Sequence, residues 1–153
     1  MYELFSQSAI NVMVLAQEEA RLQGSRLVDT EHIFLGLISE GKADAFRILN
    51  SMGLTLSVAR LEVEKNRPDN PRPAPLIPFD QDLSRPLELT PNAKAALRHA
   101  LTDERKQPVT CIETRNLLLC LLKDPDGHVL QLLPKLKIDL VELVRSIYQP
   151  AVV

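Results

Sequence analysis

The chain contains the same sequence pattern twice. Residues 5–61 align with residues 89–145 without a gap, at an offset of 84. A repeat of this length holds several helices, and two copies can bury a shared face around a pseudo-twofold axis. The duplication therefore predicts one compact domain made of two similar halves. The identical pairs are Ala9 with Ala93, Ala16 with Ala100, Arg21 with Arg105, Thr30 with Thr114, Leu35 with Leu119, Leu49 with Leu133 and Leu56 with Leu140.

The composition fits a soluble globular protein with an aliphatic core. Of 153 residues, 45% are hydrophobic and 4% aromatic, and tryptophan is absent, so leucine, isoleucine, valine and alanine must fill the interior. Twenty acidic and 18 basic residues give a net charge of -2, which provides no overall attraction for nucleic acid or an anionic membrane. We therefore expect neither class of partner.

The sequence also bears on the compartment. No apolar run reaches the roughly 18 to 20 residues of a membrane span, and the start, MYELFSQSAI, lacks a basic region followed by an apolar one. Cys111 and Cys120 are the only cysteines, and their spacing suits a reducing compartment. We therefore expect the soluble, reducing compartment in which the protein is made.

The first copy predicts four helices. Its first apolar stripe has the spacing of one helix face. Thr30 then resembles an N-cap, with Glu31 in the first turn, and the segment EHIFLGLISE that follows is apolar almost all round, which predicts a central buried helix. A third helix should end at Gly53, and a fourth should begin near Ser57. The stripe consists of Ala9, Val12, Met13, Ala16 and Ala20.

The second copy repeats this plan. Thr90 and Pro91 are an N-cap followed by proline at the first helical position, and Thr114 opens the second buried helix. Pro134 ends a short helix, and Asp139 begins the last one. The sequence therefore predicts an all-α fold of about eight helices, in two sets of four.

A proline-rich segment separates the copies. We divide this single domain into repeat one (1–66), a linker (67–88) and repeat two (89–149). The linker, KNRPDNPRPAPLIPFDQDLSRP with its immediate flank, holds six of the 11 prolines, so we expect an extended connector. Its apolar residues Leu76, Ile77 and Phe79 predict docking on the helical body; the alternative is a recognition segment for a partner.

Two phrases of the sequence carry a family resemblance. The stretch FSQSAINVMVLAQEEARLQGSRLVDTEHIFLGLISEG closely resembles the first repeat of the Clp N-terminal domain, which stands at the front of the Clp class of AAA+ unfoldases. In copy two, LTPNAKAAL resembles the opening of the second repeat, and TRNLLLCLL stands where the family has TEHLLLGLL. The resemblance covers essentially the whole chain and implies a double Clp-N repeat.

The resemblance implies a function in protein binding. No segment matches the nucleotide-binding pattern GxxxxGK[ST], so we expect no enzyme activity and no cofactor. The chain is similar to accessory or adaptor proteins that dock on the Clp machinery and influence its assembly or substrate selection. The alternative is the isolated N-terminal domain of a Clp unfoldase, which receives substrates or adaptors. The implied partners are the Clp protease core or a Clp AAA+ unfoldase, with client proteins or adaptors. The implied location is a bacterial cytoplasm, such as that of a cyanobacterium, or the plastid stroma if a transit peptide has been removed.

Some members of the family bind phosphorylated arginine, with one pocket per repeat. A helix start and a hydroxyl hold the phosphate while a carboxylate pairs with the guanidinium. The resemblance places the first pocket at Ser6 and Glu31, and the second at Thr90 and the position of Arg115. Arg115 reverses the charge, so the second pocket is expected to be lost for this ligand unless Glu113 substitutes. Glu31 has an alternative role as a first-turn acid.

Other polar residues are interpreted as structural. Cys111, Cys120, His99 and His128 are weighed as a metal site, but Cys120 replaces Gly36 in an apolar helix and resembles a small core residue. No metal site is therefore expected.

Three further polar features have structural interpretations as well. His32 favours a hydrogen-bonded structural role over that of a catalytic base. Glu18 and Glu19 point about 100° apart on a helix, and we expect both to be solvated. The basic run of Arg60, Lys65, Arg67 and Arg72 is interpreted as surface charge, with contact to an acidic partner as the alternative.

Overall fold

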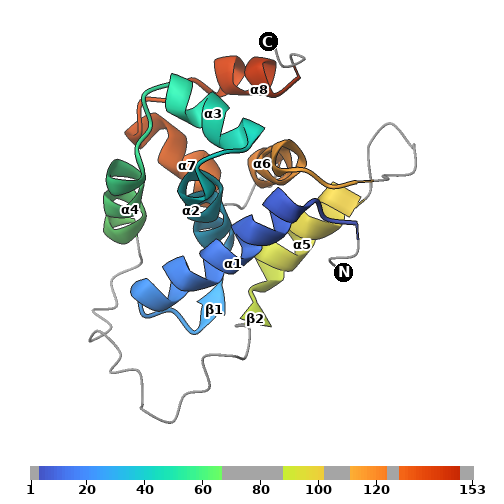
Figure 1. The fold of residues 1–153 in the computed structure, drawn as a ribbon. Coiled ribbons are helices and arrows are strands. Elements are labelled where there is room, and N and C mark those ends of the chain that lie inside the picture. Colours follow the sequence, from blue (N-terminus) through green and yellow to red (C-terminus); the bar gives the residue numbers. More distant parts are fainter. Residues whose placement is uncertain (1–3, 67–87, 102–110, 124–127, 149–153) are drawn as a thin grey trace.

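The structure is a computed structural model that describes residues 4–66, 88–101, 111–123 and 128–148. Within these ranges it has eight helices and two strands of two residues each, so the all-α expectation is confirmed (Figure 1). In chain order the elements are α1 (Gln7–Leu22), β1 (Leu27–Val28), α2 (Thr30–Glu40), α3 (Asp44–Ser51), α4 (Leu56–Lys65), β2 (Glu88–Leu89), α5 (Pro91–Leu101), α6 (Thr114–Lys123), α7 (His128–Lys135) and α8 (Leu140–Tyr148).

The two copies pair with each other through short stretches of backbone. β1 of copy one pairs in parallel with β2 of copy two, with Val28 opposite Leu89. The same contact recurs with the copies reversed, because Phe5 forms a parallel bridge with Ile112. Subtracting 84 from Leu89 and Ile112 gives Phe5 and Val28, so the two contacts are equivalent. The pseudo-twofold relation between the repeats is therefore visible in the backbone pairing.

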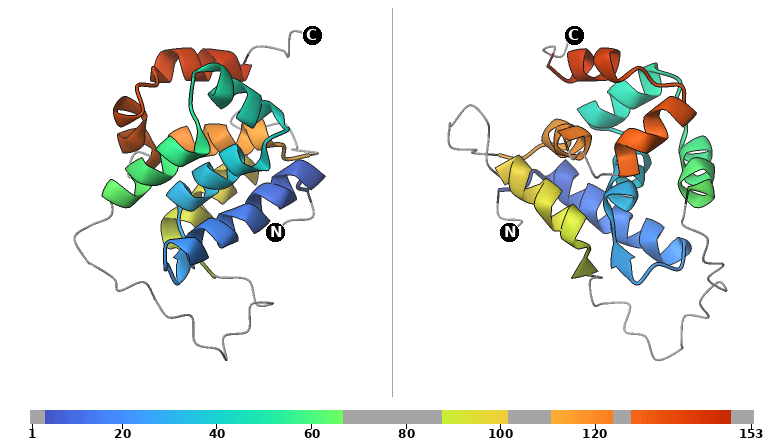
Figure 2. Two further views of the ribbon diagram at one scale, coloured as in Figure 1. Left: turned by 60° about the vertical axis from the view of Figure 1, so that its left-hand side comes forward. Right: turned by 180° about the vertical axis from the view of Figure 1, so that it is seen from behind.

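Helix α2 is the centre of the core. It packs against α1, α3, α4, α6 and α7 (Figures 1 and 2), and Ile33, Phe34, Leu35 and Leu37 have no exposed surface. Because the segment is apolar on every side, it can be buried on every side. The expectation of a central buried helix is confirmed.

Gly36 sets how closely α1 and α2 approach. A Cβ atom added at Gly36 would lie 2.5 Å from the carbonyl oxygen of Val12 and 3.1 Å from the amide nitrogen of Ala16, both on the backbone of α1. Copy two has Cys120 at the equivalent position; it is 3% exposed, and its Sγ donates a hydrogen bond of 3.0 Å to the Leu117 carbonyl. The helix pair of copy one is therefore packed too tightly at this point for any side chain.

The helix ends largely follow the sequence. Pro91 is the first residue of α5 and the Thr90 hydroxyl accepts from the Ala93 amide at 3.1 Å, as expected of an N-cap. Gly53 follows α3 with a φ of 85°, a conformation that glycine adopts without strain. Thr30, however, is not the N-cap of α2. Asp29 is, and its side chain and that of His32 form a reciprocal capping box.

Glu19 is a further correction. Expected on the solvated face of α1, it is only 2% exposed. Both of its carboxylate oxygens accept hydrogen bonds from Arg60 on α4, with Nε 3.0 Å from Oε2. These hydrogen bonds raise the pKa of the Arg60 guanidinium. Arg60 therefore ties α4 to α1 rather than serving as free surface charge, whereas Glu18 is exposed as expected.

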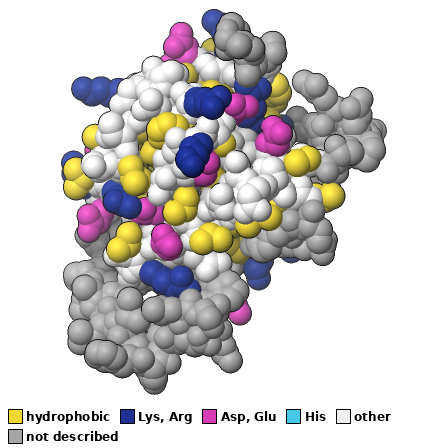
Figure 3. Space-filling view, viewed as in Figure 1, with side chains coloured by type: hydrophobic (Ala, Val, Ile, Leu, Met, Phe, Trp, Pro, Cys, Tyr) yellow, Lys and Arg dark blue, Asp and Glu magenta, His cyan; other side chains and the backbone are white. Residues whose placement is uncertain are grey.

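The domain division remains a prediction. Linker residues 67–87, with the apolar cluster at Leu76, Ile77 and Phe79, lie outside the described residues, and Glu88, assigned to the linker, is the first residue of β2. Among the described helices, none is long and apolar enough to cross a bilayer. The face shown in Figure 3 mixes acidic, basic and small apolar groups without a field of one sign.

Candidate functional site

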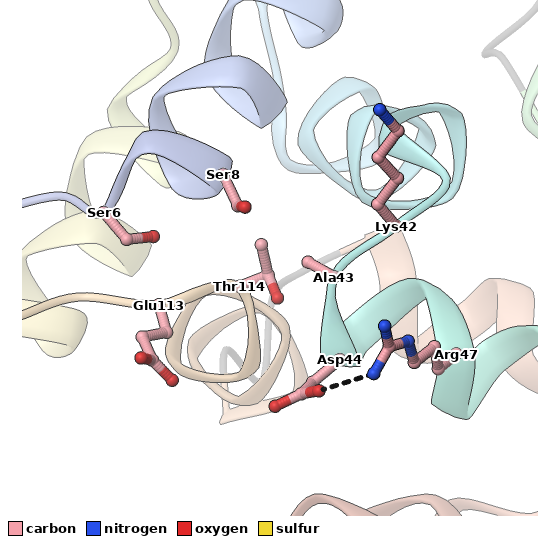
Figure 4. Close-up of a pocket in the computed structure, with 8 residues that line it drawn as sticks. All are labelled: Ser6, Ser8, Lys42, Ala43, Asp44, Arg47, Glu113 and Thr114. Carbon is pink, nitrogen blue, oxygen red and sulfur yellow. Dashed lines mark ion pairs between the residues drawn. The ribbon is translucent and has the colours of Figure 1, made fainter.

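An open pocket of about 250 Å³ lies where α1, α3 and α6 begin (Figure 4). Ser6 is the N-cap of α1 and its hydroxyl accepts from the Ala9 amide at 3.1 Å. The Thr114 hydroxyl, at the first position of α6, accepts from the Ala45 amide of α3 at 3.3 Å. We call this the Ser6 pocket. Its lining residues are Ser6, Ser8, Lys42, Ala43, Asp44, Arg47, Glu113 and Thr114.

The position of the Ser6 pocket at three helix starts gives it a positive potential. The first amide groups of a helix point away from its body and carry the positive end of its dipole. Several of these amides already have partners: the hydroxyls of Ser6 and Thr114 accept from Ala9 and Ala45, and the Glu40 carboxylate accepts from Ala43. The remaining dipoles still favour an anion at this end of the three helices.

Charged side chains of both signs surround the pocket. Asp44 joins two of them, with its Oδ2 3.2 Å from Nε of Arg115 and its Oδ1 3.9 Å from a terminal nitrogen of Arg47. Lys42 is exposed, and no carboxylate of the described residues is within ion-pair distance of its ammonium group. The other acids are Glu113 and Glu40, whose Oε2 accepts from the Lys42 amide at 3.2 Å and from the next amide at 2.7 Å. Three cations therefore face three carboxylates, and the side chains of the pocket and its rim have no net charge.

The pseudo-equivalent site, which we call the Thr90 cluster, is more acidic. It comprises Thr90, Asp29, Thr30, Glu31 and His128. The Thr90 hydroxyl donates to Oδ1 of Asp29 at 2.9 Å, and Nε2 of His128 lies 3.7 Å from Oδ2 of Asp29. Glu31, half-buried, is in the first turn of the same helix. This site presents two carboxylates at a helix start. Such an arrangement suits a ligand that carries a cationic group next to a hydrogen-bond acceptor.

The structure assembles the predicted residues across copies, not within them. The sequence resemblance paired Ser6 with Glu31 and Thr90 with Arg115. Instead, the Ser6 amide donates to the Ile112 carbonyl at 2.8 Å and Ser6 lines a pocket with Glu113. The Thr90 side chain contacts the helix start that carries Glu31. The pairing within a copy is therefore wrong, because the parallel bridges connect each copy to the other; ligand binding at Ser6, Glu31 and Thr90 remains a prediction.

Sequence reasoning missed the residues of α3 and α7 at these sites. Lys42, Asp44 and Arg47 surround the Ser6 pocket, and His128 belongs to the Thr90 cluster. A signal was available, since the offset of 84 that relates the copies places Asp44 opposite His128 and Arg47 opposite Gln131. Changes of charge between equivalent positions mark both sites.

The remaining polar residues behave as structural groups. Nδ1 of the buried His32 accepts from the Asp29 amide at 2.9 Å and its Nε2 lies 3.2 Å from Oε1 of Gln23, which confirms the structural interpretation. Cys120 is buried and Cys111 exposed. Across the ranges that the structure describes, no group of three or more histidine, cysteine, aspartate or glutamate side chains is placed to hold a metal ion.

The fold defines a helical domain built from two similar repeats. The sequence model described as the Clp repeat (R) N-terminal domain matches residues 4–136. The chain belongs to the Clp N-terminal repeat family.

The similar proteins are much longer Clp subunits. The chain is 41% identical over 145 residues to the "ATP-dependent Clp protease ATP-binding subunit ClpA homolog" of Guillardia theta, covering 94% of this chain and 16% of that protein. It is 42% identical over 141 residues to "Chaperone protein ClpC2, chloroplastic" of Oryza sativa subsp. japonica, covering 91% and 14%. The chain thus spans about a sixth or less of the length of these relatives.

A solved structure confirms the fold. The N-terminal domain of the Caseinolytic protease associated chaperone ClpD from Arabidopsis thaliana superposes with a TM-score of 0.76, covering 96% of this chain and 94% of that one. The identity is 21%, so this likeness concerns the arrangement of the helices. The expectation of a Clp N-domain fold is confirmed.

Proposed function

We propose that this protein is a non-catalytic binding module of the Clp protease and chaperone system. It acts as an accessory or adaptor subunit that docks on the Clp machinery and influences assembly or substrate selection. The observation that carries this proposal is the match of the Clp N-terminal repeat family to residues 4–136, together with two surface sites at helix starts. Its location is a bacterial cytoplasm or the plastid stroma, and the relatives with chloroplastic names support the second.

The chemistry of the Ser6 pocket supports binding rather than catalysis. Nucleophilic catalysis by serine needs a base within hydrogen-bond reach of the hydroxyl. The hydroxyl of Ser6 instead accepts from the Ala9 amide, and none of the described residues that line the pocket is a histidine. The pocket therefore offers charge and hydrogen bonds to a ligand, and no activated nucleophile.

The second candidate function is that of a substrate- or adaptor-receiving domain of a Clp AAA+ unfoldase, with phosphorylated arginine as a ligand. The Thr90 cluster supports it, because Asp29 and Glu31 supply carboxylates for a guanidinium beside the start of α2. At the Ser6 pocket the residue equivalent to Glu31 is Arg115, which repels that group. On this reading, copy one retains the acidic contact at α2 while copy two has lost it.

A reconstitution with purified components tests the proposal. The tagged chain is immobilised and exposed separately to the Clp proteolytic core and to a Clp AAA+ unfoldase of the same organism, with and without ATP. Retention of the core supports an accessory subunit, whereas retention of the unfoldase, or faster degradation of a client, supports an adaptor. Failure to bind either one, at concentrations where the chain is folded, would exclude the proposed function.

A further inference from the structure

Helix α8, at one end of the molecule, is apolar over a wider part of its circumference than the domain covers (Figures 1 and 2). Leu143 and Ile147 are buried on the side that packs against α3 and α6. Successive helix residues are turned by about 100°, so a second apolar stripe runs beside the buried one. Of the nine large apolar side chains exposed among the described residues, three belong to this helix of nine residues. The outer face of α8 consists of Leu140, Val141, Val144 and Tyr148, of which only Val144 is half-buried.

The fold itself does not require this face to be apolar. The equivalent helix of copy one is α4, and both helices pack against equivalent neighbours, α4 against α2 and α7, and α8 against α6 and α3. At three equivalent positions α4 has polar residues. An apolar face that the scaffold does not need indicates a contact with another molecule. The three pairs are Val141 with Ser57, Val144 with Arg60, and Tyr148 with Glu64.

The charges beside the outer face complement each other in a symmetric pair. Glu142 and Arg145 are exposed on its free flank, and neither forms an ion pair with another described residue. When a second α8 packs antiparallel with the two Val144 side chains at the centre, Leu140 faces Tyr148 of the second copy. Arg145 then lies within one residue of the point opposite Glu142, and the twofold axis repeats this contact. The face therefore presents both the apolar stripe and the charges that its own surface needs from a partner.

We infer that the outer face of α8 binds the same face of a second copy of this chain, as an antiparallel helix pair around a twofold axis. This inference goes beyond the proposed function, because self-association needs no Clp subunit. The helix is only about 14 Å long, so the contact buries less than the roughly 1,200–2,000 Å² of a stable interface. The dimer is therefore weak and reversible, with an expected Kd on the order of 100 µM.

Sedimentation velocity of the full chain at increasing concentration measures this association. The parent should change from monomer to dimer, and Val141→Glu should weaken the dimer at least tenfold, because it places two carboxylates in the apolar contact. Val58→Glu is the matched control: it makes the same exchange at an exposed valine of α4 and should leave the association unchanged. A parent that stays monomeric up to millimolar concentration, or an equal loss in both variants, would refute the inference.

A charge swap between two chains tests the antiparallel pairing. Glu142→Arg alone places Arg145 beside an arginine of the second copy, and Arg145→Glu alone places Glu142 beside a glutamate, so each variant should dimerise about tenfold more weakly than the parent. An equimolar mixture of the two variants should recover the parental affinity, because every contact then joins opposite charges. A defect in folding cannot be repaired by mixing. A mixture that associates no better than either variant alone would show that α8 does not pair with α8.

A Clp subunit is the competing occupant of the outer face. The same Val141→Glu and Val58→Glu variants are compared for retention of the Clp core and of the unfoldase. If the parent stays monomeric and only Val141→Glu abolishes retention, the face belongs to that subunit and self-association is wrong. If the parent dimerises through α8 and retains no Clp component, the dimer stands and the proposed function is wrong.

Discussion

Replacing Gly36 by alanine is expected to destabilise the domain, although alanine is the better helix former. Within a helix the exchange gains about 1 kcal/mol from propensity. Against this, the new Cβ would lie 2.5 Å from the Val12 carbonyl oxygen and 3.1 Å from the Ala16 nitrogen. Both atoms are backbone, so no side-chain rotation relieves the clash and α1 must move away from α2.

Overpacking of a core costs about 1–3 kcal/mol, and more where the backbone is forced to shift. Subtracting the propensity gain from the upper end leaves a net loss of about 2 kcal/mol. For a chain of this size that lowers the melting temperature by about 4–8 °C.

Urea unfolding followed by circular dichroism measures the free energy of unfolding directly. Cys120→Ala at the equivalent position of copy two is the matched control; it removes a sulfur atom without adding bulk and should lose about 1 kcal/mol. If Gly36→Ala were as stable as the parent, the close approach of α1 and α2 would not be a constraint and the reasoning would fail.

Four further substitutions test the packing between helices. Thr114→Val should lower the free energy of unfolding by about 1–3 kcal/mol, because it leaves the buried Ala45 amide without its hydrogen-bond acceptor. Thr30→Val at the equivalent position should cost little, since the described residues give the buried Thr30 hydroxyl no hydrogen-bond partner. Urea unfolding compares the two variants. Arg60→Met should lower the free energy of unfolding by about 2–3 kcal/mol, because it leaves the Glu19 carboxylate buried without its partner. The loss is smaller than for a fully buried ion pair because the Arg60 side chain is 44% exposed. Adding Glu19→Leu to Arg60→Met should recover most of that loss, and a double-mutant cycle that shows simple additivity would disprove the coupling.

Local features of the fold were predictable where they depend on residues that are close together in the sequence. Periodic apolar residues located the helices, and Thr90 followed by Pro91 marked a helix start, because both depend on neighbours in the chain. Glu19 was misplaced for the opposite reason. Its partner Arg60 is on another helix, and a pattern of hydrophobicity assigns a charged residue to solvent unless the pairing is known.

The site was harder to predict than the fold. The duplication showed which residues are equivalent, but two similar copies can complete a site either within a repeat or between repeats. The backbone pairs of Phe5 with Ile112 and of Val28 with Leu89 show that the sites form between repeats. The sequence suggested Thr30 as the N-cap of α2, whereas Asp29 caps it, because both residue types are good N-caps and the two are adjacent.

The backbone pairing between the copies has a consequence for how such a chain could arise. One repeat alone has an unpaired edge at Val28 and at Phe5, and a second identical repeat supplies what both need. The simplest ancestor is a symmetric homodimer of a single repeat. In a homodimer every substitution appears at both sites, so glutamate and arginine could not occupy the same position. Two copies in one chain are free of that restriction, and here Glu31 and Arg115 occupy equivalent positions.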